Sequence, residues 1–199
     1  MIEEALDAIQ RGKPIILPTD TVYGLATTAL HADAVLNLYR LKNRPVTQPT
    51  ALLAPDLDML FELVPELPGR ARVIARALLP GPYTLVLPNP ARRYSWLTGA
   101  NYDSIGVRVP ELPEPSAELC VRISALAATS ANHAGGPDPA RLEDVPEELR
   151  EAAAVAIDGG QLPGVPSTVI DFTGKEPRVL REGAASGAEA IERALATVG

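Results

Sequence analysis

Hydrophobic and polar positions along this chain fall into short blocks, some with helical spacing and some with the spacing of strands. The amino-terminal block places Ile2, Leu6 and Ile9 at helical intervals with acidic residues between them. Residues 15–17 are three consecutive large aliphatic residues, and Pro18 removes a backbone donor where this run ends. The pattern therefore predicts a helix followed by a short buried strand.

Blocks of the same two kinds continue to the end of the chain. An N-cap at Asp33 opens a helix that ends within residues 42–45, because Pro45 disfavours helical geometry at the residue before it. A capping box formed by Ser186 and Glu189 predicts a closing helix over residues 186–197. The remaining blocks predict strands at 50–54, 84–87, 105–109, 126–129, 155–157, 167–172 and 178–181, and helices at 56–64, 70–79, 117–123 and 147–152.

This mixture predicts one α/β (α+β) domain over residues 1–199, with a twisted mixed sheet and flanking helices. A chain of 199 residues can bury about 70% of its unfolded surface without added cross-links. No apolar stretch reaches the ~18 residues that a membrane span needs, and the first helix lacks the basic, apolar character of a signal peptide. We therefore expect a cytoplasmic protein without membrane contact.

The cysteine and histidine content and the net charge limit which kinds of disulfide, metal and nucleic-acid site the chain can form. The single cysteine, Cys120, excludes an internal disulfide and is expected to be a small apolar helix residue. His31 and His133 do not form a helical ligand pair, so no resident metal site is expected. A net charge of -7 argues against broad attraction to nucleic acid but leaves a local basic groove open.

Two polar clusters follow predicted strands. The first, residues 19–23, places three hydroxyl groups and a carboxylate within five positions, and the second, residues 130–136, combines Ser130 and Asn132 with two glycines. Such clusters are typical of binding loops, and they are equally typical of turns whose side chains satisfy the backbone. The two clusters alone do not show whether these residues bind a ligand or only form turns.

Lys42 and Arg44 place two cations at the predicted end of a helix. Phosphate binding would use such a pair, but the helix dipole favours cations there whatever their function, so both interpretations stay open. The sequence contains no P-loop, no dinucleotide-binding glycine motif after a strand and no nucleophile elbow. A P-loop is therefore excluded, and a dinucleotide-binding fold is disfavoured.

Six motifs together resemble the YrdC family, in that family's order and over roughly residues 5–183. They are LPTDTVYGL (17–25), LKNRP (41–45), PGPYTLVL (80–87), IGVRVP (105–110), TSAN (129–132) and PSTVID (166–171). The resemblance implies a single YrdC-like domain whose sheet holds an open concave substrate cavity. The chain departs from the family's pattern at residues 48–54, where many members carry a Lys-Pro-Leu or Asn-Pro-Leu stretch, some followed by a histidine.

The catalytic members of this family are threonylcarbamoyl-AMP synthases, so the resemblance implies a nucleotidyltransferase. Its substrates would be ATP, L-threonine and bicarbonate or CO2, with Mg2+ arriving with ATP, and its products threonylcarbamoyl-AMP and pyrophosphate. A downstream tRNA-modifying complex would then transfer the threonylcarbamoyl group to adenosine 37 of tRNA. The resemblance also allows a weak contact with tRNA or double-stranded RNA.

The resemblance also implies roles for individual residues. Lys42 and Arg44 would be catalytic and would contact the triphosphate and the carbamate. The other residues, by role, are Ser130, Asn132 and Arg181 for ATP, Thr19, Thr21, Tyr23 and Ser167 for threonine, and Arg108 as either a cavity cation or a structural ion-pair member.

Two other functions remain as alternatives. An RNA-binding module of the same fold would need Arg92, Arg93, Lys42 and Arg108 to gather on one face, and its RNA affinity would fall steeply with salt. A carbamoyltransferase-type relative would instead use carbamoyl phosphate in similar adenylate chemistry.

Overall fold

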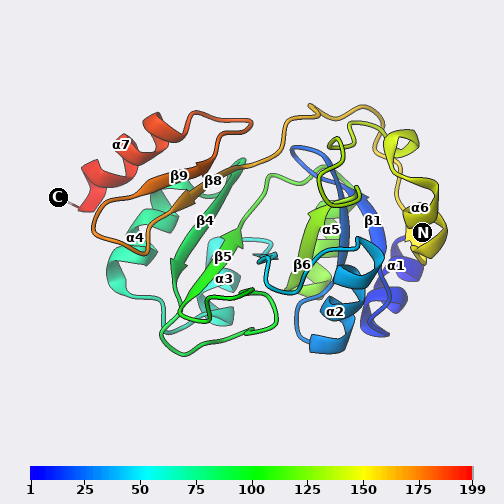
Figure 1. The fold of residues 1–199 in the computed structure, drawn as a ribbon, viewed down its shortest axis with the longest axis horizontal. Coiled ribbons are helices and arrows are strands. Elements are labelled where there is room, and N and C mark those ends of the chain that lie inside the picture. The colour runs from blue at the N-terminus through cyan, green and yellow to red at the C-terminus, as the bar shows by residue number, and fades with distance from the viewer. Residues whose placement is uncertain (199) are drawn as a thin grey trace.

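The computed structural model describes residues 1–198 and contains one nine-stranded sheet with helices around it (Figure 1). No helix within these residues is both long and apolar enough to cross a membrane. The elements in chain order are α1 (Ile2–Gln10), β1 (Ile15–Pro18), β2 (Tyr23–Thr28), α2 (Ala32–Leu41), β3 (Ala51–Leu53), α3 (Leu57–Leu63), α4 (Gly69–Leu78), β4 (Tyr83–Pro88), β5 (Ser104–Arg108), α5 (Ser116–Ile123), β6 (Leu126–Ser130), η1 (Leu142–Asp144), α6 (Glu147–Ala152), β7 (Val155–Ala156), β8 (Thr168–Asp171), β9 (Arg178–Arg181) and α7 (Gly187–Val198).

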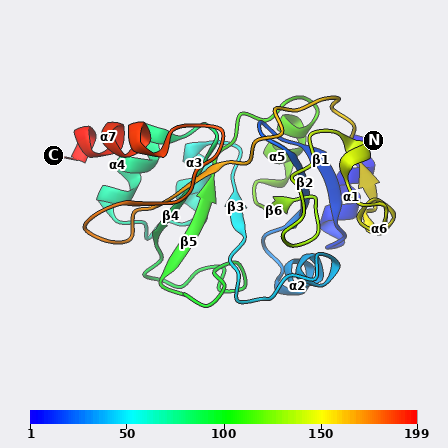
Figure 2. The same cartoon turned by 45° about the horizontal axis from the view of Figure 1, so that its top comes forward.

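The sheet is mixed, as the sequence predicts. Its strand order is β7-β1-β2-β6-β3-β5-β4-β8-β9, in which β1/β7, β3/β5 and β4/β8 pair parallel and the other neighbours pair antiparallel. In Figure 2 the short strand β3 lies between the β4–β5 part and the β1–β2–β6 part of the molecule. The two parts therefore meet near the middle of one continuous sheet.

Successive side chains of the central strands point alternately to a packed face and to an open face of the sheet. On β4, Leu85 and Leu87 are fully buried in the larger hydrophobic core, whereas Thr84 and Val86 point to the other face and line a cavity. On β3, Leu52 belongs to the larger core, and Leu53 packs into a smaller core with residues of α1 and α5. The cavity thus occupies the face of the sheet that the larger core leaves open.

Strand β2 is not predicted by the sequence pattern. Residues 23–28 were assigned to a polar loop and its continuation, but they pair antiparallel with β1, in a register that places Ile15 opposite Ala26 and Pro18 opposite Tyr23. All six residues of β2 are buried, because another strand lies on each side and packed side chains lie on both faces. A strand buried on both faces has no polar alternation, which is the signal that the prediction needed.

Other element boundaries follow the predictions within about two residues. One cap was wrong: α2 begins at Ala32 with His31 as N-cap, so Asp33 lies inside the first turn, where its charge complements the helix dipole. Ser186 does cap the closing helix, since its hydroxyl accepts a hydrogen bond of 3.3 Å from the Glu189 backbone N–H. Cys120 is buried on α5, as expected for a small apolar residue.

Candidate active site

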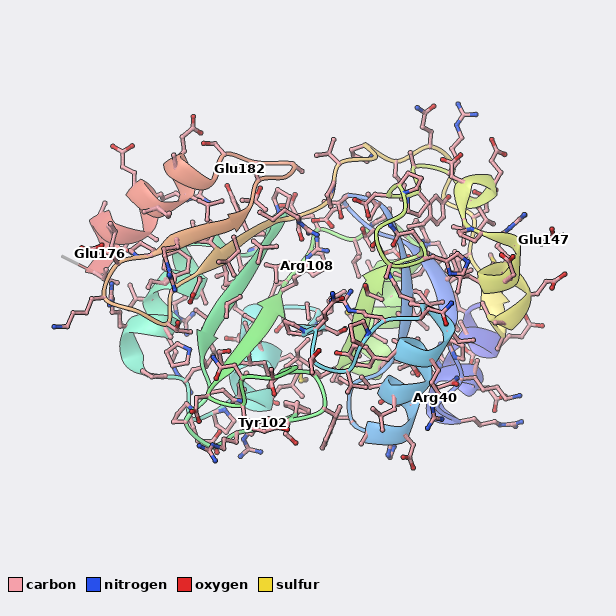
Figure 3. The ribbon with its side chains drawn as sticks, viewed as in Figure 1. Arg40, Tyr102, Arg108, Glu147, Glu176 and Glu182 are labelled. Atoms are coloured by element: carbon pink, nitrogen blue, oxygen red, sulfur yellow. The ribbon has the colours of Figure 1, made fainter. Side chains whose placement is uncertain are left out.

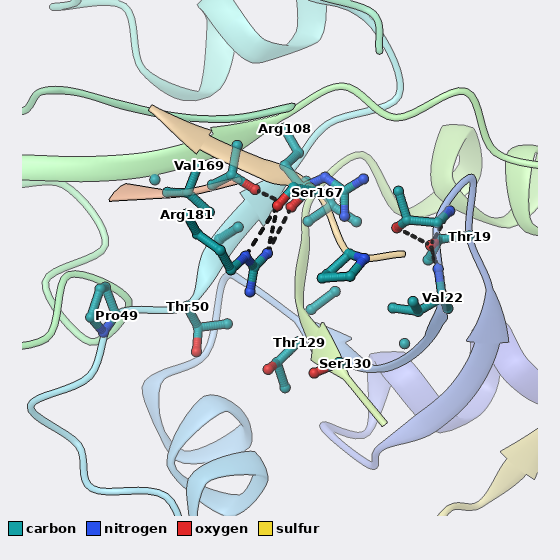
Figure 4. Close-up of a pocket in the computed structure, with 18 of the residues that line it drawn as sticks. Thr19, Val22, Pro49, Thr50, Arg108, Thr129, Ser130, Ser167, Val169 and Arg181 are labelled. Atoms are coloured by element: carbon teal, nitrogen blue, oxygen red, sulfur yellow. Dashed lines mark hydrogen bonds between the residues drawn. The ribbon is translucent and has the colours of Figure 1, made fainter. Parts of the chain in front are cut away.

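A cavity of about 350 Å³ opens on this face of the sheet (Figure 4). Polar and cationic side chains line it from the β1–β2 turn, the segment after α2, strands β4, β5, β6 and β9, and the residue before β8. Its apolar wall includes Ala51, Leu53, Val86, Val169 and Leu180. The cavity therefore combines an apolar surface with converging positive charge, which suits a ligand that is part apolar and part anionic.

Arg44 reaches the cavity from the segment after α2. Its Nη1 donates to Thr129 Oγ1 at 3.1 Å and its Nη2 to the Pro49 carbonyl at 2.5 Å, while its Nε is buried without a partner. Burial lowers the pKa of the Arg44 guanidinium, and repulsion from Arg181 lowers it further. Within residues 1–198 no carboxylate lies within salt-bridge distance of Arg44 or Arg181, so the positive charges of these two side chains face the cavity uncompensated.

Lys42 lies two positions earlier but behind the cavity wall. Its side chain is only 2% exposed, and its Nζ donates to Thr129 Oγ1 at 3.1 Å, to Asn132 Oδ1 at 3.1 Å and to the Ser130 carbonyl. Burial lowers the pKa of the Lys42 ammonium to about 7, with Arg44 adding repulsion and Asp138 opposing the shift. The structure brings Lys42 and Arg44 together, but only Arg44 lines the cavity.

Ser130 and Asn132 form a hydrogen-bonded turn at the end of β6. The Ser130 hydroxyl donates to Asn132 Oδ1 at 2.7 Å, and the Asn132 amide donates to the carbonyls of Gly136 at 2.7 Å and Pro137 at 3.2 Å. Ser130 lines the cavity, whereas Asn132 is 7% exposed and lies behind it. Asn132 therefore satisfies backbone groups of the turn, as the turn interpretation predicts, and Ser130 lies half-buried at the cavity.

Arg181 and Ser167 lie on the opposite wall, where Figure 4 shows their contacts. Arg181 donates to the Ser167 carbonyl from Nε at 3.1 Å and from Nη2 at 2.8 Å, and Nη2 also lies 3.2 Å from Ser167 Oγ. The Ser167 hydroxyl shares a hydrogen bond of 2.9 Å with Thr84 Oγ1. Predicted ATP and threonine residues thus contact each other on this wall.

The hydroxyl-rich cluster divides between the cavity and the protein interior. Thr19 and Thr21 line the cavity, with their hydroxyls 3.0 Å apart, and Thr19 Oγ1 also donates to the Val22 carbonyl at 2.7 Å. Tyr23 does not line the cavity, which corrects its predicted place in a threonine pocket. Because β2 starts at Tyr23 and directs its ring into the core, its hydroxyl instead lies 3.0 Å from Asp158 Oδ1.

Arg108 satisfies both interpretations that the sequence left open. Its guanidinium lines the cavity, and its Nη2 donates to Asp20 Oδ1 at 2.8 Å in an ion pair about 10% exposed. Burial lowers the pKa of the Arg108 guanidinium, and Asp20 counteracts this shift. Arg108 lies centrally between the two parts of the sheet (Figure 3). Arg108 Nε and Asp20 Oδ2 are buried without a partner.

Sequence reasoning did not identify several residues that shape the cavity. Thr84, Ser104 and Gly106 were inside predicted strands or next to them, where a period-two pattern alone would have placed them on the open face. Gly99 has a φ of +64° and lies so close to the segment after α2 that a Cβ would be 2.4 Å from the Thr47 carbonyl oxygen. This close approach fixes the loop that presents Arg44.

The remaining candidate groups do not join the cavity. Arg92 pairs with Asp103 at 2.8 Å and Arg93 with Glu66 at 2.6 Å, both on the exposed surface. The four basic residues that an RNA-binding module would gather on one face are therefore divided between this surface, the cavity and the interior. Residues 1–198 hold no group of three or more histidine, cysteine or carboxylate side chains that could bind a metal ion.

Comparison with known proteins finds one family across most of the chain. The Sua5/YciO/YrdC family model, described as telomere recombination, matches residues 7–183. The threonylcarbamoyl-AMP synthase of Pyrococcus abyssi is 38% identical over 92% of this chain, which spans 54% of that relative's length. The synthase of Vibrio parahaemolyticus is 33% identical over 91% of this chain and 98% of its own length. The structure of P. abyssi Sua5 complexed with L-threonine has a TM-score of 0.85 and 35% identity, covering 98% of this chain and 57% of that one.

Proposed function

Because this chain belongs to the Sua5/YciO/YrdC family, we propose that it is a nucleotidyltransferase that forms threonylcarbamoyl-AMP and pyrophosphate from L-threonine, bicarbonate or CO2, and ATP. One observation carries the proposal: Arg44, Arg108 and Arg181 converge on one cavity that has hydroxyl groups and an apolar wall. Relatives named as this synthase support it, as does the L-threonine in the related P. abyssi structure.

The reaction joins two anions, so positive charge is the main requirement of the site. The threonine nitrogen forms a bond to CO2 and loses a proton, giving a carbamate. A carbamate oxygen then attacks the α-phosphorus of ATP, and the bond from that phosphorus to the bridging oxygen breaks as pyrophosphate leaves. Cations held in place beforehand lower the repulsion between carbamate and triphosphate and stabilise the charge that develops.

Each wall of the cavity supports a different part of this proposal. Arg44 is suited to the triphosphate and carbamate, with Ser130 beside it and Lys42 and Asn132 behind. Arg181, which sequence resemblance assigns to ATP, faces them from β9.

Threonine would use the hydroxyls of Thr19, Thr21 and Ser167, which approach from the β1–β2 turn and from the residue before β8. Arg108 places a cation at the same end, held by its ion pair with Asp20.

Mg2+ fits this site as an ion brought by ATP. Within residues 1–198 the cavity lining holds hydroxyl groups and no carboxylate, so Mg2+ would be held there mainly by the substrate phosphates and the waters that it usually keeps. When bound, Mg2+ would neutralise part of the phosphate charge. We further propose that the adenylate passes to a separate complex that modifies adenosine 37 of tRNA in the cytoplasm.

A reconstitution with purified protein tests the proposal. Protein, Mg2+, ATP, L-threonine and bicarbonate should yield threonylcarbamoyl-AMP by mass spectrometry, together with pyrophosphate, and omission of any substrate should abolish both. Failure of the folded protein to form the adenylate would refute the proposal. Productive use of carbamoyl phosphate in place of threonine and bicarbonate would favour the carbamoyltransferase alternative. RNA binding that weakens steeply with salt, without adenylate formation, would favour an RNA-binding module.

Amino-acid selection tests the threonine end of the cavity. Valine has nearly the shape of threonine but would leave the hydroxyl partners in the cavity unpaired, so we expect kcat/KM for valine to be lower by roughly 10⁴-fold. Serine lacks only a methyl group and should lose roughly 10- to 200-fold. Steady-state kinetics with the three amino acids check this order, and similar values for valine and threonine would exclude hydroxyl recognition.

A further inference from the structure

The ammonium of Lys42 is fully engaged by protein acceptors. Its Nζ contacts Thr129 Oγ1 and Asn132 Oδ1, each at 3.1 Å, and the Ser130 carbonyl. A lysine ammonium has three N–H donors, so the three contacts use all of them. The side chain is 2% exposed and is absent from the cavity lining, where Arg44 lies instead.

Lys42 also joins two elements through its backbone. Its carbonyl accepts a hydrogen bond of 3.3 Å from the Ala134 backbone N–H, and its side chain binds the end of β6 from the same helix terminus. Thr129 Oγ1 accepts from both Lys42 Nζ and Arg44 Nη1, each at 3.1 Å, so it connects the two cations. Thr129 and Ser130 lie side by side at the cavity (Figure 4).

We propose that Lys42 is a positioning residue: it holds the Ser130–Asn132 turn, and through Thr129 the Arg44 guanidinium, in the geometry that binds ATP, and it does not itself contact a phosphate. The inference rests on the proposed function, because that function assigns ATP to this wall. A phosphate contact would require Nζ to leave one of its three acceptors and move out from behind the cavity wall, where the side chain is 2% exposed, and this would break the network that holds the turn. Arg44, in contrast, has a buried Nε with no partner and faces the cavity.

A double-mutant cycle on ATP binding distinguishes positioning from direct contact. Lys42→Met keeps an unbranched apolar side chain, one atom shorter, without the ammonium, and Asn132→Ala removes one of the ammonium's acceptors. If Lys42 acts through the turn, each single variant should weaken ATP binding by roughly 10- to 100-fold. The affinity of the double variant for ATP should then be only slightly lower than that of whichever single variant binds ATP less tightly. Calorimetry below pH 7, where the Lys42 ammonium is present, measures the dissociation constants.

Arg181 supplies the matched control. It lies on the opposite wall and contacts Ser167, so it shares no hydrogen-bond partner with Lys42. The fold-losses in ATP affinity caused by Lys42→Met and by Arg181→Ala should therefore multiply in the double variant. Losses that also multiply for Lys42→Met with Asn132→Ala would show that Lys42 contributes independently of the turn, which would overturn the inference.

A second cycle keeps the inference testable without any ligand. Urea unfolding of the unliganded wild type, Lys42→Met, Asn132→Ala and the double variant should show the same lack of additivity, because both substitutions break one network. Additive losses here would also overturn the inference. Adenylate synthesis by the wild type, measured on the same preparations, decides the proposed function separately: absent synthesis would refute that function while both cycles still decide the role of Lys42.

Discussion

Arg44 is the residue whose side chain best fits direct contact with the reacting anions. It lines the cavity, has no carboxylate partner within residues 1–198 and keeps a buried Nε unpaired. Its planar guanidinium also bonds Thr129 and Pro49 in two directions at once. The dipole of α2 accounts for a cation at this helix end but not for such an arrangement.

Arg44→Lys should therefore impair turnover even though it keeps the charge. A lysine ammonium cannot reproduce the planar fork, so we expect kcat for adenylate formation to fall by about 10²-fold, as for loss of one preorganised stabiliser. Arg11→Lys, in an exposed ion pair with Asp7, is the matched control and should leave turnover unchanged. Near-normal turnover of a folded Arg44→Lys variant would exclude a bidentate contact.

Lys42 should make stability depend on pH. Burial lowers its pKa from 10.5 to about 7 in the folded protein. Between these pH values the unfolded chain binds a proton that the folded protein does not, so stability should rise with pH across this window. Urea unfolding at several pH values should show that the free energy of unfolding of the wild type, relative to that of Lys42→Met, rises by at most about 1.4 kcal/mol per pH unit. A pH-independent difference would contradict a lowered Lys42 pKa.

At the scale of elements, the β1–β2 hairpin fixes the segment that leads from β7 to β8. The Tyr23 hydroxyl lies 2.8 Å from the Gly160 carbonyl and accepts a 2.9 Å hydrogen bond from the Gly159 N–H. The Thr21 carbonyl accepts a hydrogen bond from Gly164 N–H at 3.0 Å. This segment then delivers Ser167 to the cavity, so Tyr23 influences the site through backbone placement and not through a ligand contact.

Tyr23→Phe should loosen this segment without unfolding the protein. Loss of the hydroxyl removes the shared partner of the Gly159 N–H and the Gly160 carbonyl, so we expect a stability loss of roughly 0.5–1.5 kcal/mol in urea unfolding and a raised KM for threonine. The control is Tyr83→Phe, since the Tyr83 ring packs beneath Arg193 and its hydroxyl bonds no group in residues 1–198. Equal losses in both variants would refute the specific role of the Tyr23 hydroxyl.

At the scale of the whole molecule, the Asp20–Arg108 ion pair joins the two parts of the sheet. Asp20 belongs to the turn between β1 and β2 and Arg108 ends β5, so the contact spans 88 positions of sequence. Both side chains are about 10% exposed. Removal of one partner from a buried pair of this kind strongly destabilises the folded protein, because the remaining charge is left uncompensated.

Asp20→Asn should therefore destabilise the entire fold by about 3 kcal/mol or more. Asp7→Asn removes an exposed partner of Arg11 and should cost no more than about 0.5 kcal/mol, which makes it a suitable control. Urea denaturation curves of both variants against wild type measure the difference. A loss for Asp20→Asn as small as the control's would show that the pair contributes little to joining the two parts.

The sequence by itself determined most helices and strands, the single mixed sheet and the family, because caps, apolar periodicity and ordered motifs are local properties of the chain. Helix α6 and strand β9, for example, have the predicted bounds. Strand β2 escaped prediction because its burial on both faces depends on neighbours distant in sequence.

Only the tertiary structure decided which of the predicted residues face the cavity. Lys42 and Arg44 are indistinguishable as helix-end cations in the sequence, yet contacts with residues more than 80 positions away bury one and turn the other toward the cavity. The same holds for Tyr23, whose partner Asp158 lies 135 positions away. Such separations are set by strand pairing across the whole sheet, so no local pattern could have fixed them.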